Sequence, residues 1–75
     1  MKFKKLFEET FEIKISEDKF NKLLINDIKE WDSMGNINLI LAIENQYKIK
    51  FTAKEIESFT SISFIKKILK EKGIK

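Results

Sequence analysis

One serine stands out among the few residues of this chain whose types and spacing could do chemistry. Ser33 lies in the segment Trp31-Asp32-Ser33-Met34-Gly35, directly before an apolar pattern that predicts a helix. The free N–H groups and partial positive charge of a helix N-terminus favour an attached or bound phosphate. Gly35 would ease its approach by removing a side chain beside Ser33. The alternative interpretation is a helix cap, because aspartate and serine are both preferred at the N-terminus of a helix. For an Asp-Ser pair alone, a cap is more common than a modified serine.

The residue types that are missing exclude most catalytic chemistry. The chain has no cysteine and no histidine, so it lacks a thiolate, a disulfide, a zinc–thiolate site and the usual general base. No base is visible beside Ser33 to make it a nucleophile in its own right. We therefore expect that this chain is not an enzyme, that it holds no metal, and that Ser33 is modified by another enzyme.

Composition predicts one small domain spanning residues 1–75. The chain is 43% hydrophobic and 36% charged, which suits a compact helical domain. It has no apolar run long enough to cross a bilayer and no signal-peptide pattern, so we expect a cytoplasmic protein without a membrane partner. The net charge of +3 invites a nucleic-acid hypothesis, but the fifteen cations are all lysines interleaved with twelve acids. No nucleic-acid partner is expected.

The hydrophobic spacing predicts an all-α fold, a small four-helix bundle of three longer helices and one short helix. A long connection, roughly residues 13–32, follows the first helix, and Ser16 could cap a short helical turn there that carries Phe20, Leu23 and Leu24. The β-branched segment Tyr47–Phe51 is interpreted as a loop. Gly73 is a good stop for the last helix. The predicted helices cover residues 2–12, 33–47, 53–58 (capped by Thr52) and a segment from Thr60 or Ser61 to Gly73.

The predicted second helix has two apolar faces. At 100° per residue, Leu39, Ile40, Ile43 and Tyr47 form the core face. Met34, Ile37 and Leu41 fall on the far side, where a surface helix should be polar. This second face indicates either a surface for a partner or a helix that is more deeply buried than its neighbours suggest.

At this point the residues resemble a known family. Trp31-Asp32-Ser33-Met34 resembles the Asp-Ser-Leu attachment motif of acyl and peptidyl carrier proteins, with methionine in place of leucine. The similarity continues over about residues 30–70, and covers the first helix only in pattern. The residues that follow the family's spacing are Leu39, Ile43, Glu44 and Tyr47 in the second helix, Ile49, Phe51, Glu55 and Ile56 in the next loop and helix, and Thr60, Ile62 and Ile65 at the start of the last helix.

The resemblance implies a covalent cofactor and a set of partner enzymes. A phosphopantetheinyl transferase would use coenzyme A and magnesium to attach 4'-phosphopantetheine to Ser33, with Asp32 helping the transferase to dock. The arm would carry acyl or aminoacyl groups as thioesters for loading and transferring enzymes of fatty-acid or specialised biosynthesis, and the carrier would act as a monomer. Implied partner contacts are Met34, Ile37, Leu41 and Glu44, and Ile40 would line a pocket for the acyl chain.

One departure from the family pattern keeps a second hypothesis open. Many carrier proteins have a run of carboxylates on the second helix, whereas here only Glu44 is acidic between Ser33 and Tyr47. Steering toward a basic partner is therefore expected to be weak. The alternative function is an unmodified interaction module of the same fold, in which Ser33 is only a cap.

A few single residues have local interpretations of their own. We expect Trp31 to pack over the long connection rather than to contact a ligand, and Glu55 and Glu57 to be solvated. Phe64 falls off the main stripe of the last helix and would contact either a partner or the long connection.

Overall fold

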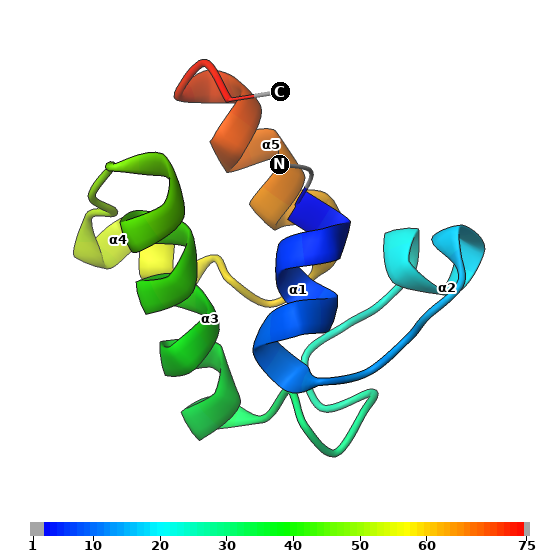
Figure 1. Ribbon diagram of the computed structural model, residues 1–75. Coiled ribbons are helices and arrows are strands. Elements are labelled where there is room, and N and C mark those ends of the chain that lie inside the picture. The colour runs from blue at the N-terminus through cyan, green and yellow to red at the C-terminus, as the bar shows by residue number, and fades with distance from the viewer. Residues whose placement is uncertain (1–2, 75) are drawn as a thin grey trace.

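The computed structural model describes residues 3–74, and within this range the chain forms helices and no strand. This confirms the all-α prediction. The predicted helical turn after Ser16 is a helix of its own, so residues 3–74 contain five helices where four were predicted. Figure 1 shows α1 beside α3, and the short α2 contacts α5. The helices are α1 (Phe3–Phe11), α2 (Glu17–Asn21), α3 (Ser33–Tyr47), α4 (Ala53–Glu57) and α5 (Ile62–Glu71).

The helix ends follow the polar residues that the sequence offers. Ser16 caps α2, and Thr52 begins α4 in a reciprocal capping box with Glu55. The Ser61 hydroxyl accepts the N–H of Phe64 at 3.1 Å and so begins α5. Gly73 has a positive φ of 84° just after α5, which is the stop predicted for it. Of the first predicted helix, residue 2 lies outside the described range.

The core is an aromatic cluster extended by aliphatic side chains. The ring of Phe7 lies 5.3 Å from that of Phe20 and 5.5 Å from the indole of Trp31, both edge-on. Phe51 and Phe59 form a second aromatic pair at 4.9 Å. Leu39, Ile40 and Ile43 bury the predicted core face of α3. The helical spacing also predicts an inner stripe for α5, and all four of its residues are buried: Ile62, Ile65, Ile68 and Leu69. α3 is thereby fixed against α1, as Figure 1 shows.

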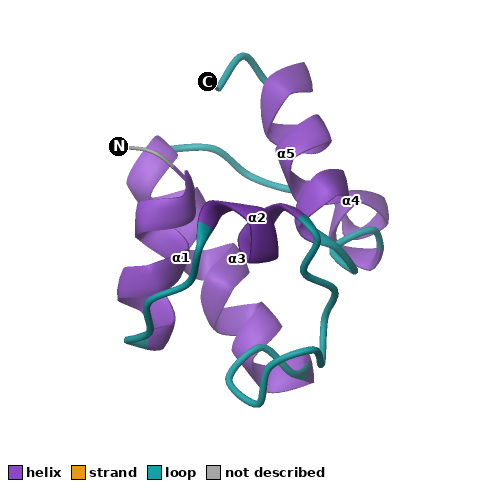
Figure 2. Cartoon of the chain, turned by 90° about the vertical axis from the view of Figure 1, so that its right-hand side faces the viewer, coloured by secondary structure: helices purple, strands orange, loops and turns teal. Residues whose placement is uncertain are grey.

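The long connection between α1 and α3 is held by its own backbone and apolar residues. The N–H of Ile25 donates to the carbonyl of Thr60 at 2.9 Å, and the N–H of Ile62 donates to the carbonyl of Leu23 at 3.0 Å. Phe20 and Leu23 are buried in the same region. In Figure 2 the connection runs down one side of the molecule and turns at the bottom into α3. The connection therefore brings a defined backbone to the start of α3.

Gly35 has a different role from the one predicted. A Cβ atom there would lie 2.1 Å from the carbonyl oxygen of Glu30 and 3.1 Å from the ring of Phe11. The missing side chain therefore makes room for the chain's own connection, on the buried side of α3, and not for an approaching phosphate.

Replacing Gly35 by alanine should destabilise the protein by about 2 kcal/mol, the usual range for overpacking, because the Glu30 backbone must move. Urea denaturation measures the change. Asn38→Ala is the control, since Asn38 is an exposed residue of the same helix and should change stability by less than about 0.5 kcal/mol. Equal stability of the two variants would contradict this packing role.

Two carboxylates tie loop backbone to helices. Glu8 accepts the N–H of Ile15 at 2.9 Å and pairs with Lys4 at 3.3 Å. Glu55 accepts the N–H of Thr52 at 2.9 Å and pairs with Lys72 at 3.1 Å. In each case the backbone hydrogen bond is the main cause that lowers the pKa of the carboxyl group. The prediction that Glu55 is merely solvated is therefore wrong, whereas Glu57 is exposed as predicted.

These pKa shifts predict a loss of stability in acid. Both carboxyl groups have a folded-state pKa below the ordinary value of 4.5, so the unfolded chain binds protons first as the pH falls. Their contribution is present above about pH 4.5 and is lost as the pH falls through the folded-state values. Urea unfolding from about pH 7 to about pH 3 should show a shallower decline for the E8Q/E55Q variant. E9Q/E57Q, at two exposed acids, should decline like the wild type. Identical curves for all three proteins would refute the assignment.

Candidate functional site

Ser33 is the first residue of α3, and its side chain is exposed. The cap of this helix is Asp32, whose backbone is extended and whose Oδ1 accepts the N–H of Gly35 at 2.8 Å. The interpretation of Ser33 as the cap is therefore wrong. Within residues 3–74 the Ser33 hydroxyl forms no hydrogen bond. Asp32 thus starts the helix and leaves the neighbouring hydroxyl available.

The buried side chain of Trp31 fixes the position of the adjacent residues Asp32 and Ser33. Its indole is fully buried, contacts Phe7, and donates from Nε1 to Oδ1 of Asn36 at 2.9 Å. The predicted packing role of Trp31 is confirmed. Sequence reasoning missed Asn36 and the carbonyl of Glu30 that lies over Gly35. A buried indole needs a hydrogen-bond acceptor for its N–H. The amide of Asn36, five residues after Trp31 and in the first turn of α3, was the signal in the sequence for that acceptor.

The second apolar face of α3 is exposed along its length. Met34 is 77% exposed, Ile37 59% and Leu41 57%. This excludes the alternative of a more deeply buried helix. The three side chains begin one residue after Ser33 and follow a single side of α3, so any protein that reaches the serine along this helix meets an apolar surface. Their role in partner binding remains a prediction.

Two other predicted site residues, Glu44 and Ile40, make contacts within the protein. The Glu44 carboxylate accepts the N–H of Phe51 at 2.9 Å and so holds the loop between α3 and α4. Ile40 is 6% exposed within the core, and it lines neither a small groove beside Leu41 and Glu44 nor a larger one between α1 and α5. Phe64 is 50% exposed on α5. Glu44 and Ile40 thus act as structural residues here, and the open groove nearest to α3's apolar face is the small one.

Between residues 3 and 74 no group of acidic side chains is arranged to hold a metal ion. Within the same range no helix has the length and apolar character needed to traverse a bilayer.

The chain was compared with protein-family models, with curated proteins and with solved structures. None of them matches. The function is accordingly inferred from the motif around Ser33 and from the geometry described above.

Because Asp32 caps α3 and Ser33 does not, alanine at these two neighbouring positions should change the stability of the protein to different extents. Asp32→Ala should lose about 1 kcal/mol of stability, because the Gly35 N–H loses its acceptor at the start of α3. Ser33→Ala should change stability by less than about 0.5 kcal/mol, because the hydroxyl is exposed and holds no described partner. Chemical denaturation of both variants measures the difference. A larger loss for Ser33→Ala than for Asp32→Ala would return the capping role to Ser33.

Proposed function

We propose that this chain is a carrier protein that bears acyl or aminoacyl groups on a 4'-phosphopantetheine arm attached to Ser33. The observation that carries the proposal is the uncommitted, exposed hydroxyl of Ser33 at the first position of α3, where Asp32 has taken over the capping role. Bound to Ser33, the arm supplies the thiol that forms the thioester. A chain without cysteine has no such thiol of its own.

The residues around Ser33 fit such a group. The first turn of a helix has backbone N–H groups without intrahelical partners, and these favour the negative charge of a phosphodiester. Asp32 satisfies the N–H of Gly35 only, so the N–H groups of Ser33 and Met34 face no competing capping side chain. No histidine is available to activate the hydroxyl. A separate phosphopantetheinyl transferase therefore supplies the base and the magnesium ion, and this chain supplies the acceptor oxygen.

The apolar face of α3 supports contact with the enzymes that load and unload the arm. Met34 follows Ser33 directly, and Ile37 and Leu41 continue the same side of the helix, all more than half exposed. Exposed apolar side chains grouped on one helix face mark interaction surfaces in soluble proteins. Glu44 is the one acidic residue between Ser33 and Tyr47, so this face offers mainly apolar contact and little negative charge. Asp32, beside the acceptor, contributes to transferase docking in this proposal.

The arrangement of the helices also supports the proposal. The order of three longer helices, one short helix before the last and a long first connection agrees with the order expected for a carrier bundle, with α2 as an addition within the connection. The protein would act in the cytoplasm, as a monomer, in fatty-acid or specialised biosynthesis. The exposed face of α3 equally suits the second candidate, an interaction module that is never modified.

Intact mass spectrometry separates the two candidates. After incubation with coenzyme A, magnesium and a broad-specificity transferase, the wild type should gain the mass of one phosphopantetheine. Ser33→Ala should gain nothing and remain folded. Ser63→Ala is the matched control, because Ser63 is another exposed serine in the first turn of a helix, and it should be modified like the wild type.

Two results would overturn the carrier proposal. One is no mass gain by a folded, unmodified protein while a known carrier protein is modified in a parallel reaction. The other is a gain that persists in Ser33→Ala. The first result makes the unmodified interaction module the better account, and partner binding through α3 would then survive Ser33→Ala.

A further inference from the structure

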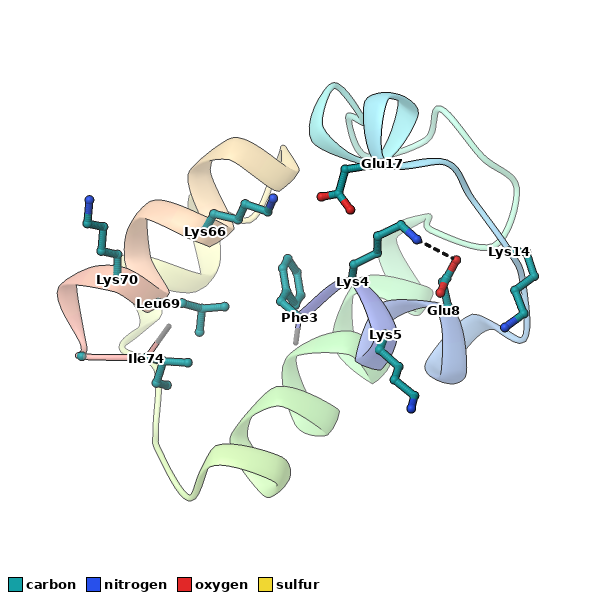
Figure 3. A pocket seen from close by; sticks show the side chains of 11 residues that line it. Phe3, Lys4, Lys5, Glu8, Lys14, Glu17, Lys66, Leu69, Lys70 and Ile74 are labelled. Atoms are coloured by element: carbon teal, nitrogen blue, oxygen red, sulfur yellow. Dashed lines mark hydrogen bonds and ion pairs between the residues drawn. The ribbon is translucent and has the colours of Figure 1, made fainter. Parts of the chain in front are cut away.

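An open groove of about 1010 Å³ lies between the N-terminal half of α1 and the C-terminal half of α5. Its apolar floor is formed by Phe3, Leu69 and Ile74. Figure 3 shows Phe3 and Leu69 facing each other across the space, with Lys70 and Lys14 at opposite ends. The part of the groove between the start of α1 and the end of α5 lies at the opposite end of the molecule from the start of α3 (Figures 1 and 2), and the groove extends from there to Lys14 and Glu17.

The charges of the described residues are unevenly divided between the groove and the rest of the surface. Five lysines and two glutamates line the groove, a formal charge of +3. The other described residues between 3 and 74 comprise eight lysines and ten acids, a formal charge of −2. Among residues 3–74, the excess of positive charge is therefore confined to the groove.

Several of these lysines are available to a ligand. Lys4 is paired with Glu8, and Lys66 donates to Oδ1 of Asn21 while its ammonium lies over the ring of Phe20. Lys5, Lys14 and Lys70 are exposed, and none of them forms a hydrogen bond or salt bridge with any residue from 3 to 74, although the charge of Lys14 contributes to lowering the pKa of the Glu8 carboxyl group. Free ammonium groups thus stand on both sides of an apolar floor, Lys5 on α1 and Lys70 on α5.

The distribution of the ammonium groups indicates the shape of the ligand. They are spread along the two rims and do not converge on one point, so an amphiphile with a single anionic head would leave most of them unpaired. A flat bilayer surface cannot reach the floor of a concave groove. A helix with an apolar stripe flanked by carboxylates matches both the floor and the rims, as in other helix-in-groove complexes. Lys66 and Lys70 are one turn apart, the spacing at which carboxylates repeat along a helix face.

We propose that this groove binds an acidic amphipathic helix of a partner protein. The apolar stripe of that helix packs on Phe3, Leu69 and Ile74, and its flanking carboxylates pair with Lys5, Lys14 and Lys70. This binding site is independent of the modification of Ser33, because no groove residue belongs to α3.

The test uses a fluorescein-labelled peptide of about 18 residues, long enough to be helical, with leucines at i, i+3, i+4 and i+7 and glutamates elsewhere. A second peptide carries lysine at every glutamate position. Fluorescence anisotropy should show that the acidic peptide binds, that its affinity falls as salt rises, and that the basic peptide does not bind.

Two double variants with the same change in charge locate the binding. K5E/K70E should weaken binding of the acidic peptide by at least about tenfold, because it reverses the charge on both rims. K29E/K67E changes two exposed lysines outside the groove, one of them on α5, and should stay within about twofold of the wild type. Both variants should still be modified on Ser33, so failure here is distinguishable from failure of the carrier proposal.

A second measurement keeps the test independent of the variants. In amide NMR spectra of the wild type, the acidic peptide should shift Phe3, Leu69 and Ile74 before any residue of α3. The proposal is overturned if the acidic peptide does not bind, if both double variants weaken it equally, or if the shifts are confined to α3. Binding of decanoate or phosphatidylglycerol vesicles that K5E/K70E abolishes, without peptide binding, would assign the groove to lipid and overturn it as well.

Discussion

The contact between Trp31 and Phe7 determines where the candidate site lies. The indole is the point at which the long connection, the middle of α1 and the first turn of α3 meet. Its Nε1 is satisfied by Asn36, so the buried ring carries no unpaired polar group and has one stable orientation. Asp32 and Ser33 follow Trp31 directly in the chain, so the packing of the indole determines where they lie. The position of the candidate site is therefore determined by the packed loop as much as by the serine itself.

The helices were predictable because their signals are local. Apolar residues at helical spacing predicted the buried stripes of α3 and α5, and Thr52, Ser61 and Gly73 marked real boundaries. The exposed second face of α3 was also visible in the sequence, although its exposure was settled only by the structure. Each of these features depends on residues within one or two helical turns of each other.

The features that sequence reasoning missed are contacts between segments. Gly35 was interpreted beside Ser33, but its real neighbour is the carbonyl of Glu30 in the connection that folds back over α3. The family resemblance implied Glu44 as a partner contact, but its role as the acceptor of the Phe51 N–H depends on where the backbone of Phe51 lies. The groove requires α1 and α5 to face each other across it, although α1 ends at Phe11 and α5 begins only at Ile62. No local pattern contains this information.

The uneven distribution of charge over the described residues gives the molecule an electric dipole in addition to its net charge. With +3 around the groove and −2 over the other described residues, the protein has a permanent dipole across a body of 25 × 23 × 19 Å. In the field of an anionic macromolecule it experiences a torque, and the end formed by α1 and α5 turns toward that macromolecule before contact. The start of α3 then points away. A partner bound between the start of α1 and the end of α5 would thus leave Ser33 exposed to the surrounding solution.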